Sequence, residues 1–222
     1  MTTPSDSRLT VLGHRLNTVI SIAVILFAVY FFLRPQGPLG RKWASYQHEQ
    51  DVTAVARSVW DSLSQGPILG GGDATLVVFT DYECPFCRAA NDTIEQALQL
   101  DSSVSIAHRH FPLTAAHPNA RAAAVLVECA DMHGRFEPVH RLLMTTSEWQ
   151  RTGDFEPLLN NMTGFDVSDW NMCRDRADIA EQLQRDSILA RNLSVAGTPT
   201  FVSRRGIHVG IPTVRKLLDL AR

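Results

Sequence analysis

Two cysteines lie two residues apart where an apolar stretch gives way to a helical pattern, and this arrangement constrains the fold more than any other feature. Residues 75–80 are apolar and predict a strand. After Cys84 and Cys87, apolar residues recur at helical spacing, which predicts a helix beginning at the cysteines. Free amides and the positive end of a helix dipole favour a thiolate there. We therefore expect Cys84, as the more exposed sulfur, to attack disulfides and Cys87 to resolve the mixed disulfide.

A CxxC pair alone also fits a zinc site or a static disulfide. Zinc sites usually need a second pair of Cys or His ligands, and the sequence has no second pair with that spacing. His108 and His110 alternate on a predicted strand and face the same side, and His117 follows soon after. Since hydrogen-bonded or solvated histidines are far commoner than ligands, we predict neither a metal site nor a bound cofactor.

Composition limits the class of protein. The chain has 222 residues, of which 45% are hydrophobic, enough for one domain with a core plus extra segments. The net charge is −2, but residues 1–42 carry five cations against one anion, which leaves about −6 on the remainder. That balance argues against nucleic-acid binding by the main domain. The even number of cysteines, 4, is compatible with two disulfides in an oxidising compartment.

The N-terminal region predicts a membrane anchor. After a short tail, residues 1–15, the stretch 16–33 contains no charged side chain. As a helix it would be about 27 Å long, close to the roughly 30 Å of a bilayer core. A cleaved signal peptide is the alternative, but no small-x-small cleavage site follows the apolar run. Arginines and a lysine lie on both sides, so charge does not set the orientation; the redox chemistry places the domain outside the cytoplasm, on the periplasmic or cell-surface side.

Residues 34–65 are predicted to be a linker. The segment 35–40 contains two prolines and two glycines, which break the anchor helix. Residues 46–63 then predict a moderately amphipathic helix that either packs on the domain or serves as a stalk. Glycine and proline at residues 65–72 mark the next boundary, so the main domain is expected over residues 66–222.

The order of elements in this domain predicts a mixed sheet with helices on its faces. The strand, helix, strand order at the start implies a parallel pair with a right-handed crossover, and the two late strands form an antiparallel hairpin. The predicted strands are residues 75–80, 104–110, 200–202 and 207–209, and the predicted later helices are residues 119–132, 134–144, 155–162, 167–174, 177–193 and 214–221.

Three ordered motifs carry a resemblance to a known family. Residues 81–87, 110–113 and 197–201 read Asp-Tyr-Glu-Cys-Pro-Phe-Cys, His-Phe-Pro-Leu and Gly-Thr-Pro-Thr-Phe. Together they resemble the DsbA-like branch of the thioredoxin superfamily, over about residues 66–222. The resemblance implies an α/β thioredoxin fold with a helical insertion at about residues 116–193, here preceded by a transmembrane helix.

The resemblance also implies roles for residues near the cysteines. Pro199 resembles the family's cis-proline beside the disulfide, and the backbone of Thr198 is expected to bind an extended substrate strand. Pro85 suits the first helical position, where a missing N–H costs nothing. Phe86 stands where strongly oxidising members carry a histidine, so we expect a less oxidising couple; Phe86 is also expected to cover the sulfur with apolar surface.

Other positions depart from the family pattern or extend it. Val78 stands where relatives place a buried carboxylate, so proton transfer at the resolving thiol needs water or another group. Asp81 and Glu83 are expected to face solvent. Cys129 and Cys173 resemble a pair that forms a structural disulfide in some relatives; two buried free thiols are the alternative.

The sequence thus predicts a membrane-anchored thiol–disulfide oxidoreductase that forms or exchanges disulfides in extracytoplasmic proteins. Its expected partners are exported proteins with cysteines and a membrane or thiol redox partner that recycles the dithiol. Two alternatives stay open: a reductase or isomerase of the same fold, and a CxxC metal-binding chaperone, for Cu(I) for example.

Overall fold

The computed structural model describes residues 21–34, 36–160 and 162–222. It divides into two compact units, Met1–Gln50 and Asp51–Arg222. The predicted N-terminal tail, residues 1–15, and the first part of the predicted anchor, residues 16–20, lie outside the described residues.

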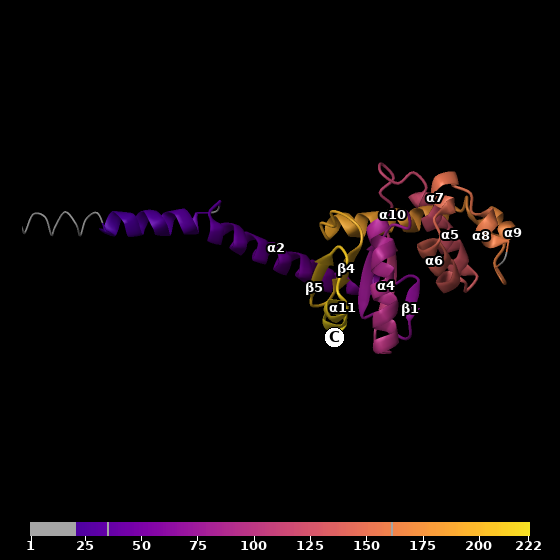
Figure 1. Ribbon diagram of the computed structural model, residues 1–222, viewed down its shortest axis with the longest axis horizontal. Helices are drawn as coiled ribbons and strands as arrows, with labels where there is room; N and C mark the ends of the chain where they lie inside the picture. Colours follow the sequence, from indigo (N-terminus) through magenta and orange to yellow (C-terminus); the bar gives the residue numbers. More distant parts are fainter. Residues whose placement is uncertain (1–20, 35, 161) are drawn as a thin grey trace, which may run out of the picture. The chain divides into compact units, whose positions relative to one another are not determined.

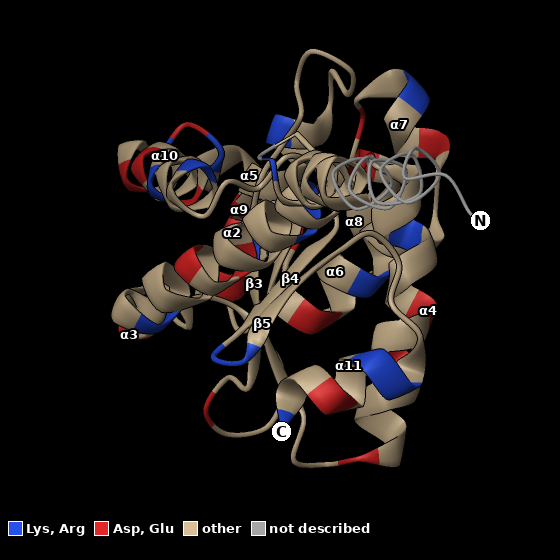
Figure 2. Cartoon of the chain, turned by 90° about the vertical axis from the view of Figure 1, so that its left-hand side faces the viewer, with Lys and Arg blue, Asp and Glu red and all other residues tan. Residues whose placement is uncertain are grey.

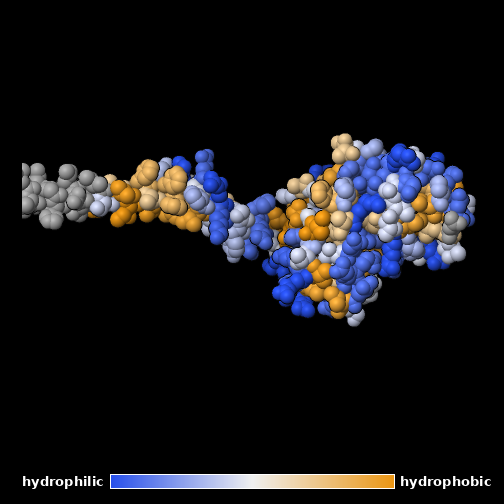
Figure 3. Space-filling model, in the orientation of Figure 1, coloured by the Kyte–Doolittle hydropathy of each residue, from blue (hydrophilic) through white to orange (hydrophobic). Residues whose placement is uncertain are grey.

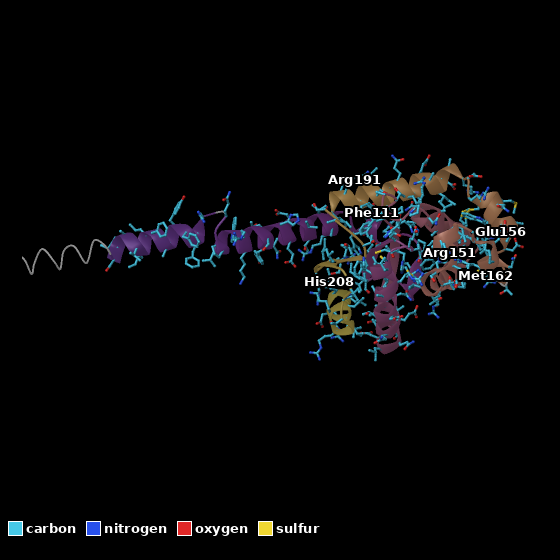
Figure 4. All side chains as sticks on the ribbon, turned by 45° about the horizontal axis from the view of Figure 1, so that its top comes forward. Phe111, Arg151, Glu156, Met162, Arg191 and His208 are labelled. Atoms are coloured by element: carbon cyan, nitrogen blue, oxygen red, sulfur yellow. A yellow bond between two sulfur atoms is a disulfide. The ribbon has the colours of Figure 1, made fainter. Side chains whose placement is uncertain are left out.

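The smaller unit contains an apolar helix over residues 21–33. Within the described residues, the helical segment Ser21–Ser58 is long and apolar enough to cross a membrane, and its most apolar window has a mean hydropathy of 1.5. Its apolar side chains are exposed, Phe27 at 69%, and they project around the helix (Figure 4). In Figure 3 this helix carries a hydrophobic surface. A soluble environment disfavours such exposure, so the segment fits a lipid environment.

Two helices follow the break predicted at residues 35–40. Helix α2 spans Pro38–Ser58 and α3 spans Trp60–Leu63. The single helix predicted over residues 46–63 therefore begins earlier and is interrupted at Val59. Residues 51–65, grouped with the linker on sequence grounds, lie in the larger unit.

A five-stranded mixed sheet forms the centre of the larger unit. Its order is β1-β3-β2-β4-β5; β2 pairs parallel with β3, and every other pair is antiparallel. This confirms the predicted parallel start and the predicted hairpin. The strands are β1 (Ile68–Gly70), β2 (Leu76–Thr80), β3 (Ser105–His110), β4 (Thr200–Ser203) and β5 (Gly206–Val209).

Alternation along β2 separates two hydrophobic cores. Val78 points to the core that contains the CxxC cysteines, whereas Val77 and Phe79 point to the opposite core. A strand buried on both faces reads as a continuous apolar run, which explains the pattern of residues 75–80. The first face is covered by α4 (Pro85–Leu100) and α11 (Val214–Ala221), and the second core includes Trp60 and Leu63 of α3.

Residues 120–173 of the helical insertion gather at one end of the larger unit, whereas the last inserted helix, residues 177–192, runs back beside the sheet and contacts β3 (Figure 1). Figure 4 labels Arg151, Glu156 and Met162 within the insertion. Basic and acidic side chains are interspersed over the helices of this unit, without a block of one sign in the view of Figure 2. The inserted helices are α5 (Ala120–Met132), α6 (Phe136–Thr145), α7 (Glu148–Thr152), α8 (Glu156–Leu159), α9 (Val167–Cys173) and α10 (Ala177–Asn192).

Candidate active site

Cys84 lies at the junction between the strand β2 and the helix α4. It is the N-cap residue of α4, with extended backbone angles, and Pro85 follows at the first helical position. A proline is favoured there because its fixed φ suits a helix and its absent N–H has no helical partner. The first amides of α4 therefore remain available to the sulfur of Cys84.

Both cysteines are buried, so the expected order, with Cys84 the more exposed, holds only by a small margin. Cys84 is 3% exposed and Cys87 is 2% exposed. In its thiol form Cys84 donates from Sγ to the carbonyl oxygen of Thr198 at 3.4 Å. Thr198 lies 114 residues further along the chain, so the local sequence around Cys84 does not predict this contact. Phe86, predicted to cover the sulfur, is itself 62% exposed.

The protein lowers the pKa of the Cys84 thiol and raises the pKa of the Cys87 thiol. The hydrogen bond that Cys87 donates to the Cys84 sulfur is the main cause that lowers the pKa of Cys84 to about 5, against the opposing effect of burial. The Thr198 side chain and the backbone N–H groups of Phe86 and Cys87 lower this pKa further. A pKa in this range favours the thiolate at neutral pH, the form of cysteine that attacks disulfides.

Cys87 is the protonated member of the pair. Burial is the main cause that raises the pKa of Cys87, and the hydrogen bond it donates to Cys84 raises it further. Its sulfur accepts a hydrogen bond from the backbone N–H of Asp81 at 3.4 Å. Cys87 thus stays a thiol until the sulfur of Cys84 is bonded elsewhere, which suits a resolving role.

Asp81 points inward, contrary to the expectation that it faces solvent. It is 1% exposed, and its carboxylate accepts hydrogen bonds from the backbone N–H groups of Glu83 and Leu113, both at 2.8 Å. It also contacts His117 Nδ1 at 2.7 Å. Burial is the largest single effect and lowers the pKa of His117, but the hydrogen bond to Asp81 and the negative charges of Asp81, Cys84 and Glu83 together outweigh it, so the pKa is raised overall.

Glu83 is only partly exposed and also binds the backbone. Its Oε2 accepts a hydrogen bond from the N–H of Asn119 at 2.8 Å. Asp81 and Glu83 together tie the loop before Cys84 to the segment that leads into α5. The sequence places these acids next to the cysteines but says nothing about which way a turn residue points.

The peptide bond between Thr198 and Pro199 is cis. The Pro199 carbonyl oxygen accepts a hydrogen bond from the N–H of Gly210 at 2.8 Å, which attaches the loop to the end of β5. The Thr198 hydroxyl is buried and has no hydrogen-bond partner among the described residues. The structure therefore brings Thr198 and Pro199 to the cysteines, as the motif order predicts.

A buried polar cluster lies on the same face of the sheet as the cysteines. Tyr82 Oη lies 3.0 Å from His140 Nδ1, and His140 Nε2 lies 3.0 Å from Asn91 Oδ1. An amide oxygen only accepts, so His140 Nε2 carries the proton and Tyr82 donates to Nδ1. His108, which pairs with Val78 across the strands, packs edge-to-face against His140 with ring centroids 4.5 Å apart.

This cluster is uncharged. Burial lowers the pKa of His140 to about 3 and holds the pKa of His108 well below its usual value, so both imidazoles are neutral. Burial also raises the pKa of Tyr82. The sequence predicts that His108 lies near His110 and His117. In the structure His108 contacts His140, which contacts Tyr82, whereas His117 contacts Asp81.

Cys129 and Cys173 are joined by a disulfide, with an S–S distance of 2.06 Å. The bond connects α5 to α9 within the helical insertion. It lies in the core that also contains Cys84 and Cys87, but those two are free thiols. One pair is therefore closed in a disulfide, and the other is present as two free thiols.

One group of three potential metal ligands occurs among the described residues: His110, Glu128 and Asp186. It does not include the CxxC cysteines. Asp186 is already occupied, because it accepts hydrogen bonds from Arg109 Nη1 at 2.9 Å, from Gln182 and from the His110 backbone N–H. An adjacent guanidinium disfavours a divalent cation, so the group reads as a buried ion pair.

Comparisons with known proteins identify the family and the fold of the larger unit. The family model described as Thioredoxin matches residues 64–210. Disulfide bond formation protein D of Bacillus subtilis (strain 168) is 27% identical over 151 residues, which are 63% of this chain and 68% of that protein. The crystal structure of the thiol-disulfide exchange protein alpha-DsbA2 from Wolbachia pipientis shares the fold, with a TM-score of 0.63 and 20% identity over 78% of this chain and 95% of that one.

Membrane antiporters contain a similar segment. Na(+)/H(+) antiporter NhaA 3 of Salinispora tropica is 33% identical over 141 residues, 61% of this chain but only 21% of the antiporter. The chain thus spans about a fifth of the length of this curated relative. The likeness concerns that segment and not the antiporter as a whole.

Proposed function

We propose that this chain, which belongs to the thioredoxin family, is a DsbA-like, membrane-anchored thiol–disulfide oxidoreductase that introduces disulfides into extracytoplasmic proteins. The observation that carries the proposal is the placement of two free thiols at the start of α4: Cys84 is its N-cap residue, and Cys87 lies one turn further in. This placement lowers the pKa of Cys84 to about 5 and raises that of Cys87. A pair of this kind can capture a sulfur through Cys84 and release it through Cys87.

The chemistry consists of two thiol–disulfide exchanges. A substrate thiolate attacks Cys84 Sγ of the oxidised enzyme, the bond between the two enzyme sulfurs breaks, and Cys87 leaves and takes a proton. A second substrate thiolate then attacks the substrate sulfur of the mixed disulfide and releases Cys84 as a thiolate. Two electrons pass from the substrate dithiol to the enzyme, and a thiol–disulfide redox partner removes them.

The acidity of Cys84 supports the oxidising direction. Its pKa of about 5 lies between about 7 for thioredoxin and about 3.5 for DsbA. A more stable thiolate makes the reduced enzyme more favourable and its disulfide more oxidising. We therefore expect a reduction potential between about −270 mV and about −120 mV, the values of those two proteins. Phe86 adds no charge, in keeping with an intermediate potential.

The apolar helix supports membrane attachment. Residues 21–33 form a helix with exposed apolar side chains, within a segment that passes the length and hydropathy requirements of a membrane span. Relatives that carry a similar domain include membrane antiporters. A catalytic domain on the extracytoplasmic side would meet exported proteins, which are the substrates we propose, in a compartment where disulfides persist.

The proposal is tested with a defined substrate. The full chain in detergent is oxidised, freed of oxidant and mixed with a reduced peptide containing two cysteines. We expect one peptide disulfide per enzyme disulfide in the wild type. The reduced Cys87→Ser variant is mixed instead with the peptide in its disulfide form: Cys84 attacks that disulfide, one peptide sulfur stays bonded to Cys84 as an adduct, and the other leaves as a thiolate. The Cys84→Ser variant is the matched control and forms no adduct. Absence of peptide oxidation, or equal adducts in both variants, would contradict the proposal.

A reductase or isomerase of the same fold is the second candidate. The observation that favours it is the exposed, uncharged Phe86 beside the thiolate. Equilibration with glutathione buffers separates the two: a potential near that of thioredoxin favours reduction, and one well above it favours oxidation.

A further inference from the structure

The first turns of α2 carry an apolar face that no described residue covers. Leu39, Trp43 and Tyr46 follow one another at i, i+4 and i+7, so they lie on one side of the helix. They are 51%, 66% and 57% exposed. The face ends at Gln50, the next position on that side, which is polar. Two large aromatic side chains at such exposure need an apolar environment or an interface.

The same face borders a hollow of about 720 Å³. Its wall includes Leu33, the last residue of the apolar helix, together with the three apolar residues of α2. The hollow therefore begins where the apolar helix ends, and the hydrophobic surface continues across the break between the two helices. A surface continuous with a membrane-spanning segment is placed to meet the same lipids.

The charges around this face have one sign. Among described residues 21–34 and 36–48 the charged side chains are Arg34, Arg41 and Lys42, and none is acidic. Arg34 lies over the ring of Phe31 at 4.7 Å, and Arg41 Nη1 donates to the carbonyl oxygen of Gln36 at 2.8 Å. These contacts hold the two guanidinium groups at the break between the helices. Clustered cations beside an apolar face complement anionic headgroups.

We propose that Pro38–Tyr46, the first part of α2, is bound in the headgroup layer of an anionic bilayer, with Leu39, Trp43 and Tyr46 turned toward the acyl chains. The inference rests on the proposed membrane attachment and goes beyond it. It makes this segment part of the membrane-binding surface rather than a stalk in water. Tryptophan and tyrosine are the residues enriched at this depth because their rings are apolar and their N–H or O–H groups stay hydrated.

The occupant is a lipid surface rather than a protein. The face is about two turns long and its cations outnumber its anions, which fits neither a heptad seam nor a core-like interface between two copies of the chain. Cations near an anionic leaflet each contribute about 1 kcal/mol, a factor of about five in the equilibrium.

Fluorescence in nanodiscs tests the proposal. The full chain is placed in nanodiscs of phosphatidylcholine with phosphatidylglycerol, either plain or brominated near the top of the acyl chains, and Trp43→Phe is measured in parallel. The other tryptophans, Trp60, Trp149 and Trp170, are buried in the larger unit at 6%, 1% and 8% exposure, so the difference between the two proteins isolates Trp43. We expect bromine to quench most of this difference emission. If the protein enters the nanodiscs and Trp43 emission is not quenched, the interfacial position of α2 is contradicted while the proposed membrane anchor stands.

The dependence on charge gives a second readout. Replacing the anionic lipid by phosphatidylcholine, or making Arg41→Gln with Lys42→Gln, is expected to weaken the interfacial equilibrium about fivefold per charge and to reduce the quenching. Arg215→Gln with Lys216→Gln removes two exposed cations from α11 and serves as the matched control, without effect on Trp43. If the quenching of Trp43 is the same without anionic lipid and without the charges of Arg41 and Lys42, the assignment of an anionic surface is contradicted. A protein that fails to enter nanodiscs at all would overturn the anchor and this inference together.

Discussion

Asp81 joins three parts of the active site through one buried carboxylate. It accepts hydrogen bonds from the loop before Cys84, from Leu113 after β3, and from His117. Its own backbone N–H donates to the sulfur of Cys87. A residue that looks like a solvated acid in the sequence is therefore a positioning residue for the resolving thiol.

Asp81→Asn tests this role. An amide supplies N–H groups where the carboxylate accepts, so we expect a loss of about 2 kcal/mol in the free energy of unfolding. We also expect the pKa of His117 to fall, because burial then acts on it without the carboxylate. Urea unfolding and NMR titration of His117 measure the two effects, and Asp92→Asn, an exposed position on α4, is the control. An unchanged His117 titration would contradict this account.

The Asp81–His117 pair also gives stability a pH dependence with a definite sign. The pKa of His117 is raised in the folded protein above its usual value of 6.5. The contribution of the pair is therefore complete below pH 6.5 and is lost as pH rises through the folded pKa. Urea midpoints measured across this range should show the loss in the wild type and not in Asp81→Asn.

The acidity of Cys84 depends on its neighbour. Because the hydrogen bond from Cys87 is the largest cause of the lowered pKa, Cys87→Ala should raise the pKa of Cys84 toward 9.0. Cys87→Ser keeps a hydroxyl donor at the same position and should raise it less. Ultraviolet absorbance of the thiolate against pH measures both variants. Equal pKa values in the wild type and Cys87→Ala would show that the helix end alone accounts for the thiolate.

At the scale of elements, the disulfide between Cys129 and Cys173 attaches α9 to α5. It closes a loop of 44 residues, and chain entropy gives about 4 kcal/mol for a loop of that length. We expect Cys129→Ala with Cys173→Ala to lower the free energy of unfolding by about that amount or less, while the Cys84 pKa is unchanged. Urea unfolding and thiolate absorbance check the two parts. A shifted Cys84 pKa would mean that the disulfide shapes the reactive site as well.

The periodic elements were predictable from sequence, and the short or remote ones were not. The strand at residues 75–80 and the final helix at 214–221 have strong apolar patterns and appear as β2 and α11. Strand β1 has three residues and α7 has five, too few to show a period. The contact between Cys84 Sγ and the Thr198 carbonyl oxygen joins residues 114 positions apart. Among the sequence features, only the order of the motifs indicated this tertiary contact.

At the scale of the whole molecule, the boundary of the catalytic unit lies before α3. Trp60 and Leu63 are buried in the second core, and Arg109 Nε donates to the Leu63 carbonyl oxygen at 3.0 Å. Arg109 also pairs with Asp186 at 2.9 Å. Removing α3 would expose apolar surface and leave a buried cation without part of its partners.

Two truncations test this boundary. Residues 51–222 should fold and keep the reactivity of Cys84, whereas residues 66–222 should be less stable by about 3 kcal/mol or more, because they lose the side chains of α3 from the core. Urea unfolding of the two proteins, monitored by circular dichroism, gives the difference. If the two proteins have equal free energies of unfolding, the catalytic unit begins at residue 66 and the segment before it is a linker.

The proposed function depends most on the ionisation of Cys84 in the folded protein. The direct measurement is the rate of Cys84 alkylation by iodoacetamide against pH in the reduced full chain, with the labelled residue located by mass spectrometry. The rate should follow a single ionisation with a midpoint at about pH 5 and reach its plateau below neutrality, despite the cover that Thr198 provides. A midpoint near pH 9, or a folded protein in which Cys84 does not react, would contradict it.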